Sequence, residues 1–399
     1  MGMINYDRGM PKIDIKKNPS KFRVGPNLSD YESTYRTFKW EDSLGELDLF
    51  SDGLNAAYEA VDRHAGKNGK RVAMHFESDT LPSEKFTFLD LKNLSNKFAN
   101  VLTGLGVGKG DRVFIFLPRI PALYISYLGI LKMGGVASTL FAAFGPDALE
   151  DRLSDSGASV VLTDSELKVR LDKVKDKLPE LKHIITIGGD GNEGGINYAD
   201  EMKGTSKNFE IVKTKPSDPA FMLYTSGTTG KPKGVVHTHN AILQQHMTAK
   251  WILDLHKSDI YWCTADPGWI TGVAYGIFGT WSNLATSVVH HGRFSPEKWY
   301  SLLEKFSVSV WYTAPTAIRM LMKSGDDLPK NYDLSALRHI CSVGELLNPE
   351  AIKWSQEVLG LPIHGNYWQT ETGAIVIANY PSMAIKPGSM GRPTPGITA

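Results

Sequence analysis

Residues 111–141 read DRVFIFLPRIPALYISYLGILKMGGVASTLF. The apolar run at 111–117 has the length of a buried strand, and the apolar segment at 121–135 begins with a proline and has the length of a helix. A second strand-like run follows at 136–141. Strands joined through helices form right-handed crossovers and lie parallel in one sheet. This stretch therefore predicts an α/β fold built on a parallel sheet with helices on its faces.

The same alternation continues along the chain. A helix is expected from Pro146, a strand at 159–164, an amphipathic helix at 165–178 and a strand at 183–189. After a polar break at 188–219, further strand-like runs lie at 220–227, 259–266, 286–291, 308–315, 337–345 and 362–368. Two later helices have clear starts, because Ser295 and Asn348 each precede a proline. Two successive α/β halves are therefore predicted.

Length and pattern suggest four segments. The chain has 399 residues, which is more than one domain at ~150 residues per domain. Residues 1–50 are polar and mixed and look like an arm laid on a larger body, and 54–65 has helical spacing. We expect an arm at 1–50, subdomains at 51–200 and 201–380, and a short extended segment at 381–399.

Composition narrows the class of protein. The 44 Lys and Arg residues nearly balance the 43 Asp and Glu residues, a net charge of +1, which argues against a nucleic-acid binder. No apolar run reaches the ~18–20 residues of a membrane span, and the N-terminus has no apolar signal core. Only Cys263 and Cys341 are present, as in proteins of reducing compartments. These features predict a cytoplasmic protein without nucleic-acid or membrane partners and leave its oligomeric state open.

Five loops follow predicted strands at the edge where open parallel sheets bind ligands. They are TSGTTGKPKG (225–234), DPGWITG (266–272), APT (314–316), GELLNPE (344–350) and WQTETG (368–373). All are rich in Gly, Thr and Pro and carry few charges, whereas loops that only connect elements are more often charged. The shared composition predicts one composite ligand site.

The first of these loops has the chemistry of a phosphate site. Glycines let backbone N–H groups approach phosphate oxygens, hydroxyls add hydrogen bonds, and Lys231 and Lys233 supply positive charge. No Walker sequence G-x-x-x-x-G-K-[ST] occurs, and a flexible Gly/Thr turn is the alternative. The match GDGNEG (189–194) to a dinucleotide motif carries two acids and is interpreted as a surface loop. His237-x-His239 and His290-His291 lack further metal ligands and are interpreted as core or surface residues.

YTSGTTGKPKGVVHTHN (224–240) resembles the phosphate-binding signature of the adenylate-forming superfamily. YWQTETG (367–373) resembles its second signature, and SVGELLNPE (342–350) its adenine loop. DYESTYRTFKW, AAYEAVDRH, YWCTADPGWITG and WYTAPTAIRMLM resemble the AMP-forming acetyl-CoA synthetases within it. The resemblance implies a layered αβαβα domain with two mixed sheets, the start of a small β-barrel at 381–399, and the ATP and acyl sites in 201–380. It also implies ATP and Mg²⁺ as cofactors, with acetate and coenzyme A as substrates.

The resemblance also implies residue roles. The β- and γ-phosphates would be held by Thr225, Ser226, Gly227, Thr228, Thr229, Gly230, Lys231 and Lys233. Thr225 and Glu371 would position Mg²⁺, and Glu371 and Lys233 would be the catalytic residues. The adenine and the rest of the nucleotide would contact Gly344, Glu345, Leu346, Gly365, Asn366, Tyr367, Gln369 and Thr370. The chain departs from its nearest relatives at two of these positions, with Gly365 in place of Asp and Tyr367 in place of Trp.

The acyl pocket of such enzymes would be walled by Trp269, Ile270, Thr271, Val343 and Trp368. In this family a tryptophan at the position of Trp368 restricts the pocket to short acids, and medium-chain enzymes have glycine; the alternative is a core tryptophan that supports the loop. Thr271 would approach the thiol of coenzyme A, and Lys168 or Arg170 its phosphates.

Family members continue into a small C-terminal α+β domain that supplies a lysine for adenylation, and no such domain follows PGSMGRPTPGITA (387–399). We therefore expect a truncated chain that is impaired or inactive in the full reaction. The main alternatives are a ligase for propionate or another short acid, and a non-catalytic adenylate-binding module.

Overall fold

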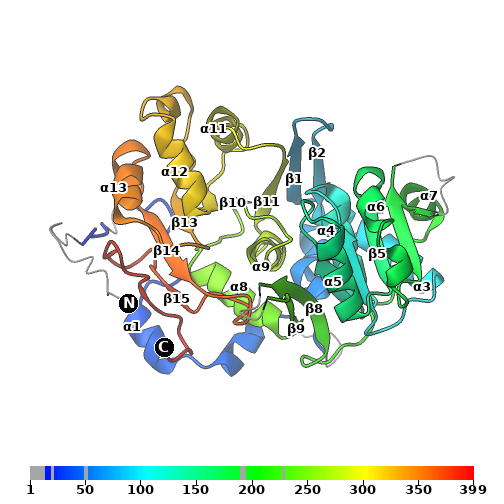
Figure 1. The fold of residues 1–399 in the computed structure, drawn as a ribbon. Coiled ribbons are helices and arrows are strands. Elements are labelled where there is room, and N and C mark those ends of the chain that lie inside the picture. The colour runs from blue at the N-terminus through cyan, green and yellow to red at the C-terminus, as the bar shows by residue number, and fades with distance from the viewer. Residues whose placement is uncertain (1–13, 19–21, 49–52, 189–194, 227–229) are drawn as a thin grey trace.

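The computed structural model describes residues 14–18, 22–48, 53–188, 195–226 and 230–399. Within these ranges the strands form two sheets (Figure 1). The seven-stranded sheet has the order β7 (Ile196–Asn197), β6 (His183–Ile187), β5 (Val160–Asp164), β3 (Arg112–Phe116), β4 (Val136–Thr139), β8 (Pro219–Thr225) and β9 (Lys233–Thr238). Its strands are parallel except at the β8–β9 hairpin.

The nine-stranded sheet has the order β16 (Arg392–Pro393), β15 (Ile377–Ala378), β14 (Ile363–Tyr367), β13 (His339–Ser342), β12 (Val310–Thr313), β10 (Ile260–Cys263), β11 (Thr286–His291), β1 (Val72–Ser78) and β2 (Glu84–Thr87). Six central strands, from β14 to β1, are parallel, and antiparallel strands lie at both ends. Residues 381–399 add β16 to this sheet.

Each sheet contains strands from both sides of the expected boundary near residue 200. Strands β1 and β2 come early in the chain but pair with β11, whereas β8 and β9 come later and pair with β4. The sequence patterns did not predict β1, β2 or β9. The division into 51–200 and 201–380 stays a prediction, and the sheets do not follow it.

Helices cover both sheets. They are α1 (Tyr31–Thr37), α2 (Arg63–Asn68), α3 (Phe88–Gly104), α4 (Pro121–Lys132), α5 (Pro146–Ser156), α6 (Ser165–Leu171), α7 (Tyr198–Gly204), α8 (Ala241–Trp251), α9 (Ile270–Val273), α10 (Gly279–Ser282), α11 (Pro296–Lys305), α12 (Pro315–Lys323) and α13 (Pro349–Val358). Single π turns lie at Tyr58–Asp62 and Ala274–Phe278, and 3₁₀ turns at Trp40–Glu46, Lys175–Lys177 and Leu328–Asn331. None of the described helices is long and apolar enough to cross a membrane.

Two helix predictions can be compared directly. Ser295 caps α11 by accepting a hydrogen bond from Lys298 N, as its position before a proline predicted. The helix predicted over 165–178 is too long, because α6 ends at Leu171 and only a 3₁₀ turn follows. Lys and Asp fill most positions after Leu171, so little apolar surface is left to hold a helix there.

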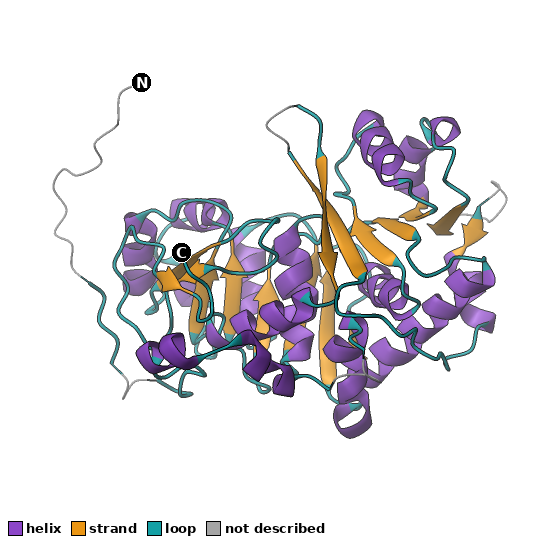
Figure 2. Cartoon of the chain, turned by 90° about the horizontal axis from the view of Figure 1, so that it is seen from below, coloured by secondary structure: helices purple, strands orange, loops and turns teal. Residues whose placement is uncertain are grey.

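Helices and sheets are stacked in layers (Figure 2), and alternating side chains on the strands face different layers. On β3, Val113 and Ile115 face the central core, while Phe114 and Phe116 face the outer core. Helices α3, α4 and α8 contribute to the central core between the sheets, α5 and α6 pack outside the seven-stranded sheet, and α11, α12 and α13 pack outside the nine-stranded one. The result is the predicted αβαβα arrangement.

The N-terminal arm holds the far end of the chain. In Figure 1 the blue helix α1 lies beside the red C-terminal segment. The Tyr31 hydroxyl donates to the carbonyl oxygen of Pro393 at 2.8 Å, and the Trp40 indole N–H donates to that of Gly396 at 3.1 Å. Gly396 has φ +81°, and a Cβ there would lie 2.8 Å from the Trp40 indole nitrogen. We call this contact the aromatic clasp; through it, residues of the arm pack against the C-terminal segment.

Candidate active site

The loop that is predicted to bind phosphate connects two antiparallel strands. Thr225 ends β8 and pairs in register with Lys233, the first residue of β9. Thr225 is half-buried, whereas Ser226, Gly230, Lys231 and Lys233 are exposed. Among the described residues, neither lysine side chain makes an ion pair, so both ammonium groups are open to a ligand. Gly227, Thr228 and Thr229 lie outside the described residues.

The second signature loop, 368–373, is tightly folded. The Gln369 N–H donates to Thr372 Oγ1 at 3.1 Å, and the Gly373 N–H donates to the Gln369 and Thr370 carbonyl oxygens. Gly373 has φ +73°, and a Cβ at this position would lie 3.0 Å from the His237 ring. Only glycine therefore fits this turn without displacing the imidazole.

His237 joins the two signature loops. It lies on β9, and its Nε2–H donates to the Thr370 carbonyl oxygen at 2.8 Å, a contact between residues 133 positions apart. Burial lowers the pKa of His237, which keeps the imidazole neutral near pH 7. Sequence reasoning interpreted His237 as a core or surface residue and missed this bridge, because nothing local marks it.

A buried aromatic group stands behind the loop. Trp368 is only 8% exposed, and its ring meets that of Tyr275 edge-on, with centroids 5.1 Å apart at 89°. The Trp368 indole N–H donates to the Tyr312 hydroxyl at 3.3 Å, and that hydroxyl donates to Asn366 Oδ1 at 2.9 Å. Burial raises the pKa of both tyrosines, so both stay protonated and can donate. We call Trp368, Tyr275, Tyr312 and Asn366 the aromatic wall; the two tyrosines were not predicted.

Asn366 has a free donor at this wall. Its side chain is 3% exposed, and among the described residues Nδ2 has no hydrogen-bond partner. A buried unpaired amide N–H costs free energy, which a bound acceptor would recover. Val343 lies at the end of the adjacent strand β13 and is buried.

The predicted residue Trp269 ends the loop after β10, and Ile270 and Thr271 begin helix α9. Strand β12 lies between β10 and β13 in the sheet. The loop is compact, because Asp266 Oδ1 accepts from the Gly268 N–H at 2.8 Å and Asp266 pairs with Arg119 at 3.6 Å. Ile270 is buried, Thr271 half-buried, and the Trp269 ring 55% exposed. Parallel strands β10, β13 and β14 therefore bring all five predicted acyl residues to one edge, from three separate segments.

The predicted adenine loop is exposed. Gly344 has φ +99°, Leu346 is 71% exposed and Tyr367 is 41% exposed. Glu345 is held from α12, because its carboxylate accepts from Thr316 Oγ1 and from the Arg319 guanidinium, both at 2.5 Å. These hydrogen bonds lower the pKa of the Glu345 carboxyl, and the bond from Thr316 has the largest effect. The exposed side chains of Leu346 and Tyr367 are left free to face a ligand.

Two further predicted residues have open surroundings. A Cβ on Gly365 would lie 3.6 Å from Asn379 Nδ2, an ordinary contact, so the space admits a side chain. Glu371 is exposed, and among the described residues its carboxylate makes no ion pair. Together with the Thr225 hydroxyl, it offers the oxygen donors that Mg²⁺ prefers, and no group of three or more His, Cys, Asp or Glu forms a denser site within the described ranges.

Lys168 and Arg170 are already engaged on α6. The Lys168 ammonium is bonded to Asp172 Oδ2 at 2.7 Å and the residue is buried. Arg170 donates to the carbonyl oxygens of Ala142 at 2.7 Å and Phe144 at 3.1 Å. Neither is the simply solvated cation that an exposed helix face would give, and a role toward coenzyme A phosphates stays a prediction.

Comparisons with known proteins identify the family of this chain. The family model described as AMP-binding enzyme matches residues 61–399. An acetyl-coenzyme A synthetase of Bacillus subtilis is 51% identical over 377 residues, 94% of this chain and 66% of the relative; one of Streptomyces coelicolor is 40% identical, covering 88% and 58%. The crystal structure of a Brucella canis acyl-CoA synthetase superposes with a TM-score of 0.86 at 33% identity, covering 92% of this chain and 67% of that one. This chain spans less than two thirds of the length of both curated relatives, and it belongs to the AMP-binding enzyme family.

Proposed function

We propose that this chain binds ATP and acetate for an AMP-forming acetate–CoA ligase reaction. Acetate attacks the α-phosphorus of ATP, giving acetyl-adenylate and pyrophosphate, and coenzyme A then takes the acetyl group and releases AMP. The observation that supports the proposal is the aromatic wall beside the two signature loops, because a closed aromatic surface next to loops of this composition suits a small acid beside a nucleotide.

The first step needs alignment and charge neutralisation rather than a base, because acetate is already a nucleophile. Lys231 and Lys233 leave their ammonium groups free for phosphate oxygens, and the free Asn366 Nδ2 offers a donor to the reacting groups. Bound Mg²⁺, held by Thr225 and Glu371, would neutralise triphosphate charge. The exposed faces of Leu346 and Tyr367 would take the adenine.

The preference for acetate rests on Trp368. Its indole is fixed by an edge contact with Tyr275 and a hydrogen bond to Tyr312, so it cannot swing aside without losing both. Each methylene in an apolar pocket is worth about 1–3 kcal/mol of discrimination. A fixed indole therefore excludes longer acids strongly and propionate less.

A calorimetric titration with non-reactive alkyl-phosphate esters of adenosine tests the proposal. We expect esters with two- and three-carbon tails to bind, and the six-carbon ester to bind at least tenfold more weakly. Lys233→Ala should weaken the binding of ATP, whose β- and γ-phosphates this lysine would hold, and should leave the tail preference of the esters unchanged. Lys323→Ala, at the C-terminal end of α12, is the charge-matched control. Equal binding of all tails would contradict the acetate assignment, and no binding of any ester would contradict the nucleotide site.

A further inference from the structure

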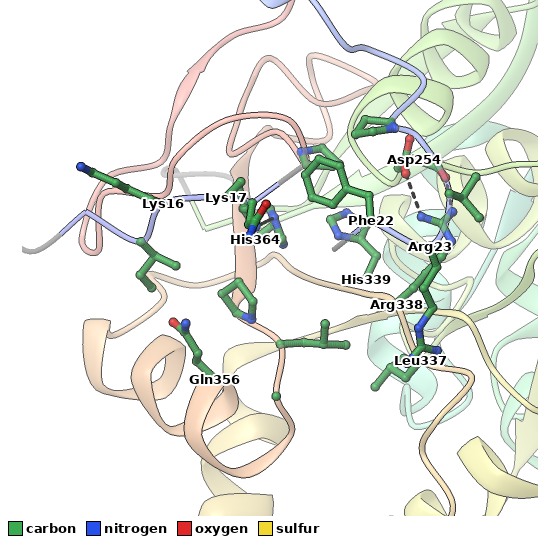
Figure 3. Close-up of a pocket in the computed structure, with 18 residues that line it drawn as sticks. Lys16, Lys17, Phe22, Arg23, Asp254, Leu337, Arg338, His339, Gln356 and His364 are labelled. Carbon is green, nitrogen blue, oxygen red and sulfur yellow. Dashed lines mark hydrogen bonds and ion pairs between the residues drawn. The ribbon is translucent and has the colours of Figure 1, made fainter. Parts of the chain in front are cut away.

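A cavity of about 430 Å³ lies at the opposite edge of the nine-stranded sheet (Figure 3). It is lined by the N-terminal arm on one side and by residues at the starts of β13 and β14 on the other, among them His339 and His364. His364 precedes Trp368 by four residues, so the two sites are separated by about 13 Å of strand at ~3.3 Å per residue. The volume is in the range of small-molecule sites.

The cavity holds a lysine without a counter-charge. The Lys17 ammonium contacts His364 Nε2 at 2.7 Å, and among the described residues no carboxylate pairs with it. The His364 ring is buried, its Nδ1–H donates to the Ile340 carbonyl oxygen at 3.2 Å, and Nε2 therefore accepts from Lys17. Burial holds the pKa of His364 well below its usual value and lowers that of Lys17 to about 8, so the lysine carries the charge at pH 7.

Among the other charged residues that line the cavity, Asp254 and Arg338 are paired with each other, whereas Arg23 makes no ion pair among the described residues and lies beside Arg338 in Figure 3. Asp254 binds Arg338 at 2.7 Å and accepts from the Asn27 N–H at 2.8 Å, and Arg338 also binds Asp259 at 2.5 Å. Arg23 donates to the Ser335 carbonyl oxygen. An ammonium has three N–H donors, of which His364 takes one, so Lys17 keeps donors for a bound anion.

Apolar side chains form part of the cavity wall. Phe22, Leu361 and Pro362 line the cavity, and Figure 3 shows Lys16 directed away from the other labelled residues while Lys17 lies beside His364. A single ammonium that pairs with no carboxylate among the described residues, in a cavity whose wall includes these apolar groups, matches a single negative charge on an apolar body better than a phosphate dianion. We propose that this cavity is a second ligand site, which binds a small aliphatic monocarboxylate through Lys17.

Octanoate is the probe, titrated by calorimetry into the protein and three variants. Lys17→Met should weaken octanoate about ten- to a hundredfold, the loss of a hydrogen bond to a charged group. Lys16→Met removes an equal charge from the neighbouring residue and should change the affinity less than threefold. Lys17→Arg keeps the charge and should retain most of the affinity. Thermal unfolding of each variant checks that the fold is intact.

Three outcomes would overturn the proposal: Lys17→Met binding like the parent, 1-octanol binding as well as octanoate, or no binding to the parent protein at millimolar octanoate. Tighter binding of octyl phosphate would replace the carboxylate by a phosphate and would also overturn the proposed ligand class. The readout uses neither ATP nor coenzyme A, so it is independent of the proposed ligase function. Octanoate binding should persist when the two-carbon adenosine ester is present.

Discussion

The aromatic wall and the adenine loop border the same candidate site but differ in how they are held. The indole of Trp368 is 8% exposed and fixed by two tyrosines, whereas Leu346 and Tyr367 are 71% and 41% exposed. Groups fixed before binding discriminate ligands by shape, while exposed groups gain contacts only when the ligand arrives. Under the proposed function, the difference means that acid selection is built into the fold and that adenine contacts are left for the ligand to complete.

The largest expected effect comes from opening the wall. Trp368→Gly should shift the relative affinity for six-carbon over two-carbon adenosine esters by about a thousandfold, from four methylenes at no less than about 1 kcal/mol each. Calorimetry with the ester series measures it. Trp368→Phe keeps an aromatic surface against Tyr275 and should retain the short-tail preference. An unchanged preference in the glycine variant would mean that Trp368 only supports the loop.

Low pH should lower the stability of the fold by protonating two buried histidines. Burial lowers the pKa of His239 and His339 to about 4, below the ~6.5 of an unfolded chain. The unfolded state then binds protons first, so stability is present above pH 6.5 and is lost as pH falls toward 4, by about 2 kcal/mol per histidine at pH 5. Urea unfolding at pH 7.5, 6 and 5 measures this. Equal stability at all three values would contradict the buried, neutral state of these rings.

A smaller change tests the hydrogen bonds within the wall. Tyr312→Phe leaves the Trp368 N–H and Asn366 Oδ1 without their shared partner and should cost about 1–3 kcal/mol of unfolding free energy. Tyr127 is the matched control, because its buried hydroxyl has no hydrogen-bond partner among the described residues. Tyr127→Phe should therefore cost nothing. Equal losses in the two variants would show that hydroxyl burial, not the shared bond, sets the cost.

The smallest effect is expected at the adenine loop. The Arg319–Glu345 pair is nearly half exposed on both sides, and such pairs contribute about 0.2–1 kcal/mol. Arg319→Ala should therefore weaken the two-carbon ester no more than about fivefold. Lys353→Ala, which removes an exposed pair with Glu357 on α13, gives the baseline. A loss above about tenfold would show that this loop is as firmly fixed as the wall, and the comparison would fail.

The central strands and the loops after them could be predicted because buried parallel strands are continuous apolar runs. The strands that the sequence patterns did not predict lack such continuous apolar runs. β1 carries His75, Glu77 and Ser78 among its apolar residues, and β9 begins inside a glycine-rich loop. At the site, residues in the exposed loops resembled known motifs. His237, Tyr275 and Tyr312 did not, because their positions follow from contacts with distant parts of the chain.

The aromatic clasp sets an order of events during synthesis. Tyr31 and its acceptor Pro393 are 362 residues apart, and Trp40 and Gly396 are 356 apart. At ~5–20 residues per second on the ribosome, the arm waits about 20–70 seconds before its partners exist. Until then Tyr31 and Trp40 lack these acceptors, although every strand of the seven-stranded sheet, which ends at Thr238, has already been synthesised. The arm would therefore remain available for the longest time to a chaperone that binds aromatic segments. Closure of the clasp would be among the last steps of folding.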